Sequence, residues 1–427
     1  MDDDWTSRPR RTRAGVIAVG LVTGGMIGVV TLASNAVPST PPPAPPDHTT
    51  PVVDGLAVTE PARGASLVPV APTARSSGPS PMPDPTVELK DGRPAGPAAP
   101  SVPAATLPSP AASSPTSPAR PPAPGGFWLS GGSRNLNKLS AAYEWAEMRG
   151  RPVTFATVFS TRDAGWEAFV QTHGGSGQIA AYTDKSMTLL IQTPPFPKNV
   201  GASYEALIAG AYDTYWQRIG TVLRQREAQG YPPVIVSIGW EMNGEFMYWG
   251  GGSASHRYTN PAQFVAAYRR IVSQLRVTYP QVQTAWVINA HGTPAATGTT
   301  DSFAFYPGDD VVTYIGSDDY DHYPPAPTRE AFDVRASRDG GLYWLANHAR
   351  AHGKRIVIPE WGLSRGSHGG GDNPTYIQCM WDTFQRWHAE GLLYAEYYFA
   401  DPIDGSNVDS DLVSGNPASR ARYAALW

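Results

Sequence analysis

Short apolar or β-branched runs alternate with helical patterns over residues 126–427, and this alternation predicts an α/β fold. We count eight such runs, and strands that are apolar throughout are typical of a parallel sheet covered by helices. A segment of about 300 residues is close to the usual size of a closed (β/α)8 barrel, the TIM barrel. An open doubly wound sheet is the alternative, but no glycine-rich phosphate loop follows the first run. We therefore expect a (β/α)8 barrel.

Strands are expected where apolar runs lie, and helices where apolar residues recur every three to four positions. Asn260-Pro261 begins one helix with an N-cap and a first-turn proline, and Asn373-Pro374 begins another in the same way. The expected strands are residues 126–129, 153–159, 187–192, 234–240, 284–290, 311–317, 356–360 and 392–399.

The first 36 residues have the composition of an export segment. Arginines precede residue 14, and residues 14–36 carry no charge. Such a run is either a signal peptide, with small residues at Ser34-Asn35-Ala36 for cleavage, or a single-pass membrane anchor. In the second case the arginines stay in the cytoplasm and the rest of the chain faces outward. Either way we expect an extracytoplasmic protein, secreted or anchored to the cell membrane.

Residues 37–125 are dominated by proline, alanine, serine and threonine. This composition buries too little apolar surface to fold, so we expect a disordered linker. Aromatic residues become frequent from residue 126 onward, where the folded domain is expected to begin and to continue to residue 427.

The charge balance and the cysteine content restrict the class of partner. The net charge is −4, and no cluster of lysine and arginine lies beyond the N-terminal segment, which argues against nucleic acid. Cys379 is the only cysteine, so an intrachain disulfide is excluded. We interpret it as a packed thiol in a predicted helix. These features fit a monomer that binds a neutral substrate without a cofactor or metal.

Two glutamates lie where a barrel of this type carries its chemistry, at the carboxyl ends of strands. The fourth expected strand runs into Gly239-Trp240-Glu241, and the seventh leads through Pro359 to Glu360. Strands four and seven lie nearly opposite each other in a ring of eight, so these carboxyls can face one another across the barrel mouth. The alternative for each is an ion pair with an arginine at the strand end.

A facing pair of carboxyls is what a retaining glycosidase requires. One carboxyl protonates the leaving oxygen, the other attacks the anomeric carbon, and the two stand about 5 to 5.5 Å apart. Apolar neighbours would raise the pKa of Glu241 and keep it protonated, whereas hydrogen bonds would keep Glu360 ionised. We therefore interpret Glu241 as the acid/base and Glu360 as the nucleophile.

Two segments carry a resemblance to a known family. The string WEMNG at residues 240–244, followed by WG at 249–250, resembles the acid/base segment of glycoside hydrolase family 26. The string PEWG at residues 359–362 resembles that family's nucleophile segment. The resemblance extends over residues 126–427. It implies a β-mannanase-like enzyme of the superfamily whose carboxylates lie on strands four and seven.

The sequence departs from that family at positions that contact the central sugar. Trp240 stands where the family usually has histidine, and Tyr397 and Tyr398 stand where the superfamily commonly has a tryptophan beneath the sugar. These departures leave the glycan open between β-mannan and another glycan, such as xylan, mixed-linkage glucan or a cell-envelope glycan.

Further residues near the two glutamates are candidates for holding the sugar. Asn243 is interpreted as a partner of a sugar hydroxyl or of Glu241, with a simple turn as the alternative, and Trp249 as a stacking platform. The resemblance implies that Tyr320 or Tyr323 hydrogen-bonds Glu360. The expected substrate-binding residues are Trp240, Asn243, Trp249, Asn289, His291, Tyr320, Tyr323, Trp361 and Tyr398.

Other polar residues have competing interpretations. A divalent-metal site built from Asp319, Asp321, His322 and His291 is the alternative for the end of the sixth strand. No paired-histidine motif on the first strand supports it, and we expect no metal. A core or ion-pair role is favoured for Trp166, Gln192 and Glu396.

Taken together, these features predict an endo-acting retaining β-glycanase that works by double displacement. The alternative from another class is a non-catalytic carbohydrate-binding barrel. The presence of both Glu241 and Glu360 disfavours it, because a degenerate site would tend to lose one of them.

Overall fold

A computed structural model of the chain describes residues 127–427 except 135–136, 175–176, 252–256 and 403–407. The expected export segment and linker, residues 1–36 and 37–125, lie outside the described residues. Among the residues that the structure describes, no helix is both long and apolar enough to cross a membrane.

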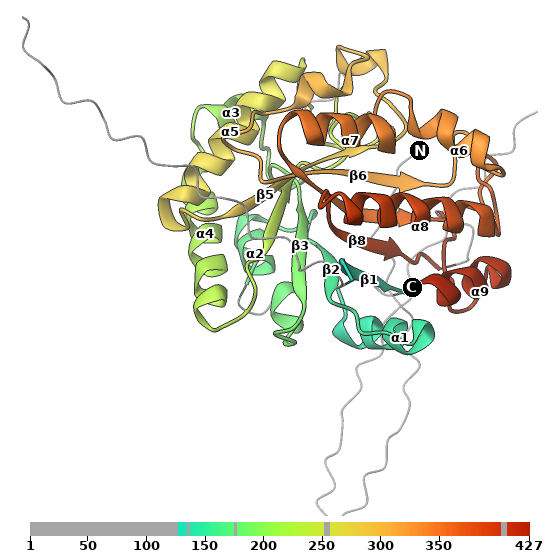
Figure 1. The fold of residues 1–427 in the computed structure, drawn as a ribbon. Coiled ribbons are helices and arrows are strands. Elements are labelled where there is room, and N and C mark those ends of the chain that lie inside the picture. Colours follow the sequence, from blue (N-terminus) through green and yellow to red (C-terminus); the bar gives the residue numbers. More distant parts are fainter. Residues whose placement is uncertain (1–126, 135–136, 175–176, 252–256, 403–407) are drawn as a thin grey trace, which may run out of the picture. The chain divides into compact units, whose positions relative to one another are not determined.

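Eight parallel strands form a nearly closed barrel with helices around it, which confirms the expected (β/α)8 fold (Figure 1). Neighbouring strands pair in the order β1-β8-β7-β6-β5-β4-β3-β2. At the seam between β1 and β2, the backbone N–H of Thr154 donates to the carbonyl of Ser130 at 2.9 Å. The strands are β1 (Leu129–Ser133), β2 (Phe155–Phe159), β3 (Thr188–Thr193), β4 (Ile235–Ile238), β5 (Gln283–Asn289), β6 (Tyr314–Tyr320), β7 (Arg355–Gly362) and β8 (Leu393–Phe399).

The helices begin where the sequence predicted N-caps. Asn260 accepts a hydrogen bond from the backbone of Gln263 at the start of α5, and Asn373 accepts one from Tyr376 at the start of α8. Cys379 is buried within α8, as expected for a packed thiol. The helices are α1 (Leu139–Arg149), α2 (Trp166–Thr172), α3 (Tyr204–Ile208), α4 (Asp213–Ala228), α5 (Pro261–Thr278), α6 (Arg329–Ala336), α7 (Leu342–Ala351), α8 (Pro374–Ala389) and α9 (Pro417–Leu426), with short 3-10 turns η1 (Ile179–Ala181), η2 (Ala295–Thr297) and η3 (Ser302–Phe305).

Two strands lie about three residues later than the sequence predicted. The first was expected at residues 126–129, but β1 includes the small residues around Gly131, where a Cβ would lie 1.8 Å from the carbonyl oxygen of Phe155. The close approach of β2 therefore requires glycine at this position of β1, beyond the expected end of the strand. The sixth strand was expected at 311–317, but β6 includes Asp318 and Asp319, whose carboxylates are buried with partners inside the protein.

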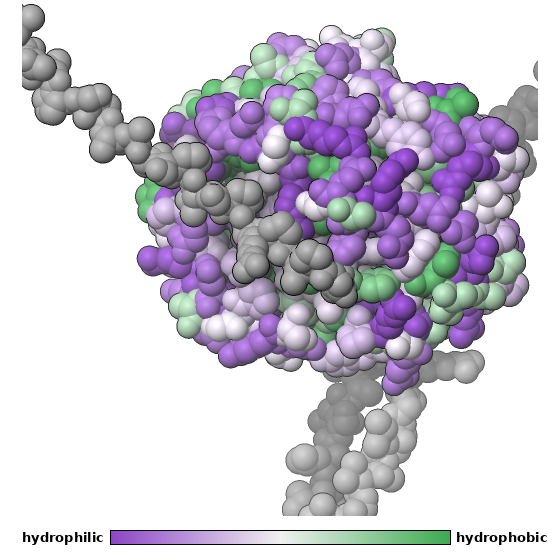
Figure 2. All heavy atoms as spheres, in the orientation of Figure 1, coloured by the Kyte–Doolittle hydropathy of each residue, from purple (hydrophilic) through white to green (hydrophobic). Residues whose placement is uncertain are grey.

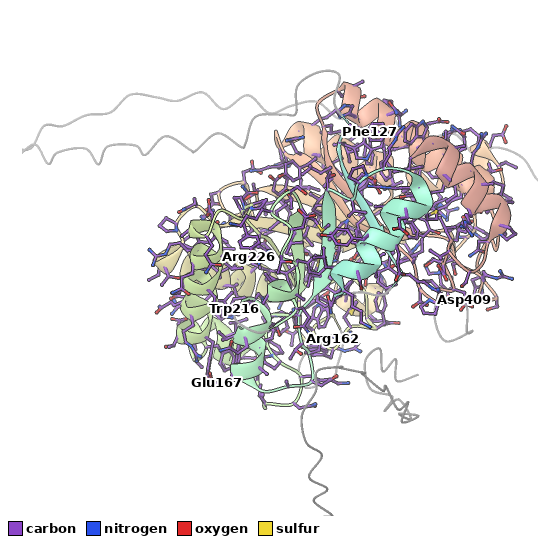
Figure 3. The ribbon with its side chains drawn as sticks, turned by 90° about the horizontal axis from the view of Figure 1, so that it is seen from below. Phe127, Arg162, Glu167, Trp216, Arg226 and Asp409 are labelled. Carbon is purple, nitrogen blue, oxygen red and sulfur yellow. The ribbon has the colours of Figure 1, made fainter. Side chains whose placement is uncertain are left out.

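The two ends of the barrel carry different residues. Arg162 and Asp409 follow the carboxyl ends of β2 and β8, and Phe127 precedes β1; Figure 3 shows the first two at one end and Phe127 at the other. On the face drawn in Figure 2, hydrophilic residues predominate and apolar ones are scattered. The end that carries Arg162 is therefore where strand-end chemistry is to be sought.

One buried carboxylate outside the mouth joins distant parts of the fold. Glu396 of β8 accepts indole N–H bonds from Trp361 at 2.6 Å, Trp427 at 2.9 Å and Trp128 at 3.3 Å. Burial raises the pKa of Glu396, and the indole donors oppose that rise. The favoured core role of Glu396 is therefore confirmed.

We expect Glu396→Ala to lower the free energy of unfolding by about 3 kcal/mol or more, because it leaves three buried indole donors without an acceptor. Urea unfolding measures the change. Glu390→Ala is the matched control, since Glu390 forms an exposed ion pair with Arg350 that is worth less than about 1 kcal/mol. Equal losses in the two variants would contradict the expectation.

Candidate active site

Glu241 enters the barrel mouth on a turn that directly follows β4. The chain leaves the strand at Ile238 and adopts left-handed backbone angles at Gly239, with φ of 59°, and again at Glu241, with φ of 52°. For a non-glycine residue this conformation costs roughly 1 to 3 kcal/mol, and it is held here by hydrogen bonds. The N–H of Glu241 donates to Val287 O, and its carbonyl accepts from Gly244, both at 2.9 Å.

The side chain of Glu241 is 7% exposed, and the amide of Asn289 donates to its Oε1 at 2.7 Å. Burial, followed by the negative charge of Glu360, raises the pKa of Glu241 to about 8. Glu241 therefore holds a proton at neutral pH, as a general acid must.

Glu360 lies within β7, opposite Asp318 of β6, and is 6% exposed. The hydroxyl of Tyr320 donates to its Oε2 at 2.8 Å, and the amide of Gln192 donates to its Oε1 at 3.2 Å. Burial raises the pKa of Glu360 to about 7, and these donors oppose the rise by stabilising the charged form. Glu360 is therefore the carboxyl of the pair that ionises more readily.

A third buried carboxyl, Asp318, adjoins this pair. Burial and the charges of Glu360 and Glu241 raise its pKa well above the usual range. A hydrogen bond between Asp318 and Glu360 lowers the pKa of Glu360 and raises that of Asp318. A protonated Asp318 that donates to Glu360 thus helps to keep Glu360 charged. Sequence reasoning did not single out Asp318, although an acidic residue inside an otherwise apolar strand is a usable signal.

Aromatic rings from four strand ends meet at the end of the barrel that carries the carboxyls. The ring of Phe159, at the end of β2, packs edge-on against Trp240 and against Phe399 of β8, with centroid distances of 5.8 and 5.9 Å. The ring centroids of Tyr320 and Phe399 are 6.0 Å apart. Phe159 and Phe399 were not among the expected site residues, although each is the last residue of an expected strand. Trp240, next to Glu241 in the chain, and Tyr320, bonded to Glu360, connect these rings to the two carboxyls.

Four of the expected substrate-binding residues are enclosed in the protein and bond other parts of the fold, and their contact with substrate stays a prediction. The amide of Asn243 donates to the carbonyls of Asn289 and Gly292, and its oxygen accepts from the Asn289 backbone. It fixes the β4 and β5 ends to each other. The other three are buried aromatic residues whose polar atoms bond within the fold: Trp249 to Trp240 O, Trp361 to Glu396 and Tyr398 to Ser410 O.

Of the remaining candidates, Asn289 bonds Glu241 directly. Of the two tyrosines, Tyr320 and not Tyr323 bonds Glu360. Tyr323 is 57% exposed, and its ring centroid lies 4.6 Å from that of His322. The ring of His322 in turn packs against His291, with 4.4 Å between the centroids. Burial lowers the pKa of His291 well below its usual value, so it is neutral. Trp240 is almost fully buried against Trp249 and offers little surface to a sugar.

The residues that had competing interpretations make different kinds of contact in the structure. The guanidinium of Arg335 lies between Asp319 and Asp321, with its nitrogens 2.9 and 3.3 Å from their carboxylate oxygens. It stands where the alternative interpretation placed a metal ion. Trp166 is half-buried and stacks on Tyr215 with 4.6 Å between the ring centroids, as a packing role implies. Gln192 is buried, as its favoured core role implies, but it also donates to Glu360 and so adjoins the site.

The raised pKa of Glu241 also has a consequence for stability. Below about pH 4.5 Glu241 is protonated in both the folded and the unfolded chain. Between pH 4.5 and about 8 it loses its proton only in the unfolded chain. This ionisation stabilises the unfolded chain and so lowers the free energy of unfolding. We expect Glu241→Gln to melt at a higher temperature than the native protein near pH 7.5, and this difference to vanish near pH 4. Glu245→Gln, at an exposed position nearby, is the control. A difference that is independent of pH would contradict the assignment.

The fold and this site together define a class: a (β/α)8 barrel with two opposed carboxyls of unequal pKa at strands four and seven, as retaining glycosidases have. The family model of glycosyl hydrolase family 26 matches residues 199–344, which include Glu241 but not Glu360. These comparisons confirm the resemblance to glycoside hydrolase family 26.

The chain is also similar to individual members of that group. A mannan endo-1,4-beta-mannosidase of Bifidobacterium adolescentis is 26% identical over 175 residues, which cover 40% of this chain and 17% of the length of that protein. The catalytic domain of the family 26 endo-β-1,4-mannanase of Bacillus sp. JAMB-750 has a TM-score of 0.50 at 14% identity, covering 70% of this chain and 85% of that domain. GH26C of Muricauda sp. MAR_2010_75 reaches 0.51 at 13% identity, covering 70% and 84%. At these identities the structural likeness supports the barrel fold.

Proposed function

We propose that the protein is a retaining, endo-acting glycoside hydrolase that cleaves a β-linked polysaccharide. The observation that carries the proposal is the unequal environment of two buried carboxyls at one barrel mouth. Glu241 has burial and a neighbouring anion that favour its proton, whereas Glu360 has the donors Tyr320 and Gln192 that favour its charge. A pair divided in this way supplies an acid and a nucleophile at the same pH.

In the first step a carboxylate oxygen of Glu360 attacks the anomeric carbon while Glu241 gives its proton to the departing glycosidic oxygen. The bond to the leaving sugar breaks, and a glycosyl ester of Glu360 forms. In the second step Glu241, now ionised, takes a proton from water, which attacks the same carbon and releases Glu360. Two inversions return the original configuration.

β-Mannan is the proposed substrate, because the family match and the Bifidobacterium relative both point to mannanases. Xylan, mixed-linkage glucan and a cell-envelope glycan are the alternatives, since Trp240 replaces the histidine usual in the family. The proposal includes export, which rests on the uncharged run at residues 14–36, and attachment to the membrane if that run is retained.

The full chain should be tested on β-mannan, xylan and mixed-linkage glucan, with release of reducing ends and loss of viscosity measured together. A rapid fall in viscosity with few new ends on β-mannan would support endo-acting mannanase activity. Turnover of another polymer would change the substrate and keep the chemistry. Saturable binding to a polymer without turnover would favour the carbohydrate-binding alternative.

We expect a bell-shaped dependence of kcat/KM on pH. Activity should fall below about pH 7 as Glu360 gains a proton and above about pH 8 as Glu241 loses one. Initial rates at low substrate concentration, measured from pH 4 to 10, determine both limbs. An acid limb near the ordinary carboxyl pKa of about 4.5 would contradict the buried state of Glu360.

A further inference from the structure

The tyrosine that bonds the nucleophile stands at the end of its strand. Tyr320 is the last residue of β6 and pairs with Gly362 of β7, in a regular run of pairs that follows a register shift between Gly316 and Asp318. Such pairing fixes the backbone and not the direction of a side chain. Other contacts must therefore also fix the direction of the Tyr320 hydroxyl toward Glu360.

Two aspartates flank Tyr320, and both point away from Glu360 because side chains alternate along a strand. Asp319 and Asp321 are buried, and each makes hydrogen bonds on the side of the sheet that faces α6 and α8. Burying two carboxylates next to each other is unfavourable unless a cation and hydrogen-bond donors accompany them. The contacts that neutralise them are therefore also the contacts that hold the strand end.

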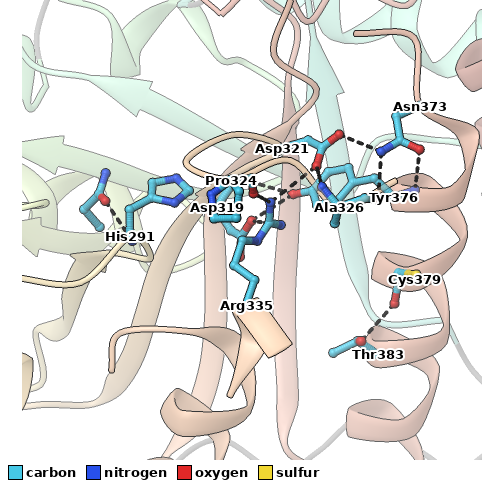
Figure 4. A network of polar contacts seen from close by, with 11 residues as sticks. His291, Asp319, Asp321, Pro324, Ala326, Arg335, Asn373, Tyr376, Cys379 and Thr383 are labelled. Carbon is cyan, nitrogen blue, oxygen red and sulfur yellow. Dashed lines mark hydrogen bonds and ion pairs between the residues drawn. The ribbon is translucent and has the colours of Figure 1, made fainter. Parts of the chain in front are cut away.

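Arg335, in the last turn of α6, is the cation that bridges the two aspartates (Figure 4). Its Nη2 lies 2.9 Å from Asp319 Oδ1, and its Nη1 lies 3.3 Å from Asp321 Oδ1 and donates to Pro324 O at 3.3 Å. The guanidinium is buried. Because each terminal nitrogen engages a different carboxylate, a lysine ammonium at this position cannot reproduce the geometry.

The backbone N–H of Ala326 donates to Asp321 Oδ1 at 2.7 Å, and further donors come from the N-terminal end of α8. The hydroxyl of Tyr376 donates to the carbonyl and carboxylate of Asp319, and the amide of Asn373 donates to Asp321 Oδ2 at 2.7 Å. A Cβ at Gly370 would lie 2.0 Å from that same Oδ2, so the loop before α8 is closed over the carboxylate. Both sides of Tyr320 are thus attached to helices outside the barrel.

We propose that Arg335 is a positioning residue for the nucleophile. By holding Asp319 and Asp321 in one geometry, it keeps the Tyr320 hydroxyl on Glu360 and so favours the charged form of Glu360. The inference rests on the proposed function for its predicted effect on turnover. Its predicted effect on the pKa of Glu360 rests on the hydrogen-bond geometry alone.

The pKa of Glu360 is the quantity that this arrangement controls, and it has several other neighbours. Glu241 comes from the β4 end, Asp318 and Tyr320 from β6, Gln192 from β3, Tyr397 from β8 and Arg162 from the loop after β2. Arg335 acts on it through Tyr320. A loss of Arg335 should therefore matter only while the Tyr320 hydroxyl is present.

The test is a double-mutant cycle in the full chain with Arg335→Lys, Tyr320→Phe and the double variant. The pKa of Glu360 is followed by NMR of protein labelled with 13C at glutamate carboxyls, with the signal assigned by Glu360→Gln. We expect each single variant to raise the pKa of Glu360, because the charged form loses a donor. In the double variant, Arg335→Lys should add nothing to the effect of Tyr320→Phe.

In parallel, kcat/KM of Arg335→Lys should fall about 10- to 100-fold, as for a displacement of about 1 Å, with its acid limb at higher pH.

Arg149→Lys is the matched control, because Arg149 is also buried but bonds Ser130 at the opposite end of the barrel. It should lower stability and leave the pKa of Glu360 unchanged. If Arg335→Lys does not fold, Tyr376→Phe removes a single donor to Asp319 and should raise the pKa of Glu360 by less. An unchanged pKa in these variants, or an equal shift with and without Tyr320, would overturn the inference. Absence of turnover by the native protein would overturn the proposed function alone, since the titration does not need turnover.

Discussion

Glu360→Ala is expected to lower kcat on β-mannan on the order of 10⁴-fold or more, because it removes the atom that forms the glycosyl-enzyme. The variant should fold, since Glu360 is a buried carboxyl whose pKa is raised and not a member of a buried ion pair. Initial rates on β-mannan and a thermal melt of the same sample measure both consequences.

Azide provides the positive control for this variant. With a mannoside that carries an acidic phenol as leaving group, azide should occupy the space left by the carboxylate and attack the anomeric carbon. The product should be a glycosyl azide of inverted configuration, because one displacement replaces two. A kcat reduced less than about tenfold would show that another group is the nucleophile.

Glu241→Ala should produce a different kinetic pattern. We expect kcat/KM on the polymer to fall about 10²- to 10⁴-fold, because the departing sugar oxygen no longer receives a proton. An aryl mannoside whose phenol leaves as a stable anion should lose far less in kcat/KM, and its glycosyl-enzyme should accumulate because the second step lacks a base.

The comparison of the two leaving groups separates the acid from residues that only support it. Azide should restore turnover of the aryl mannoside by Glu241→Ala and give a product of retained configuration, opposite to that from Glu360→Ala. Equal losses on the polymer and the aryl mannoside would contradict the role of Glu241 as the acid.

The barrel and its two glutamates could be predicted because both depend on local patterns. An apolar run predicts a strand wherever it lies, and the residue after such a run lies at the barrel mouth, as for Glu241 and Glu360. The small residues around Gly131 gave no such pattern, because the close approach of β2 and not hydrophobicity makes them a strand.

The rest of the site depends on the directions of side chains and on contacts between residues far apart in the sequence. Trp249 follows Glu241 closely in sequence, yet its indole turns back to bond Trp240 O, which no local pattern reveals. Gln192 meets Glu360 across 168 positions of the chain. Such partners become visible only when the strands are placed side by side.

The central claim is that Glu241 and Glu360 act as the acid and the nucleophile of a double displacement. The most direct test follows the first new reducing ends by 1H NMR during hydrolysis of a β-mannan oligosaccharide by the full chain. The mechanism predicts that the β-anomer appears first and then mutarotates. Initial appearance of the α-anomer would mean that a water molecule attacks directly, and it would contradict the mechanism.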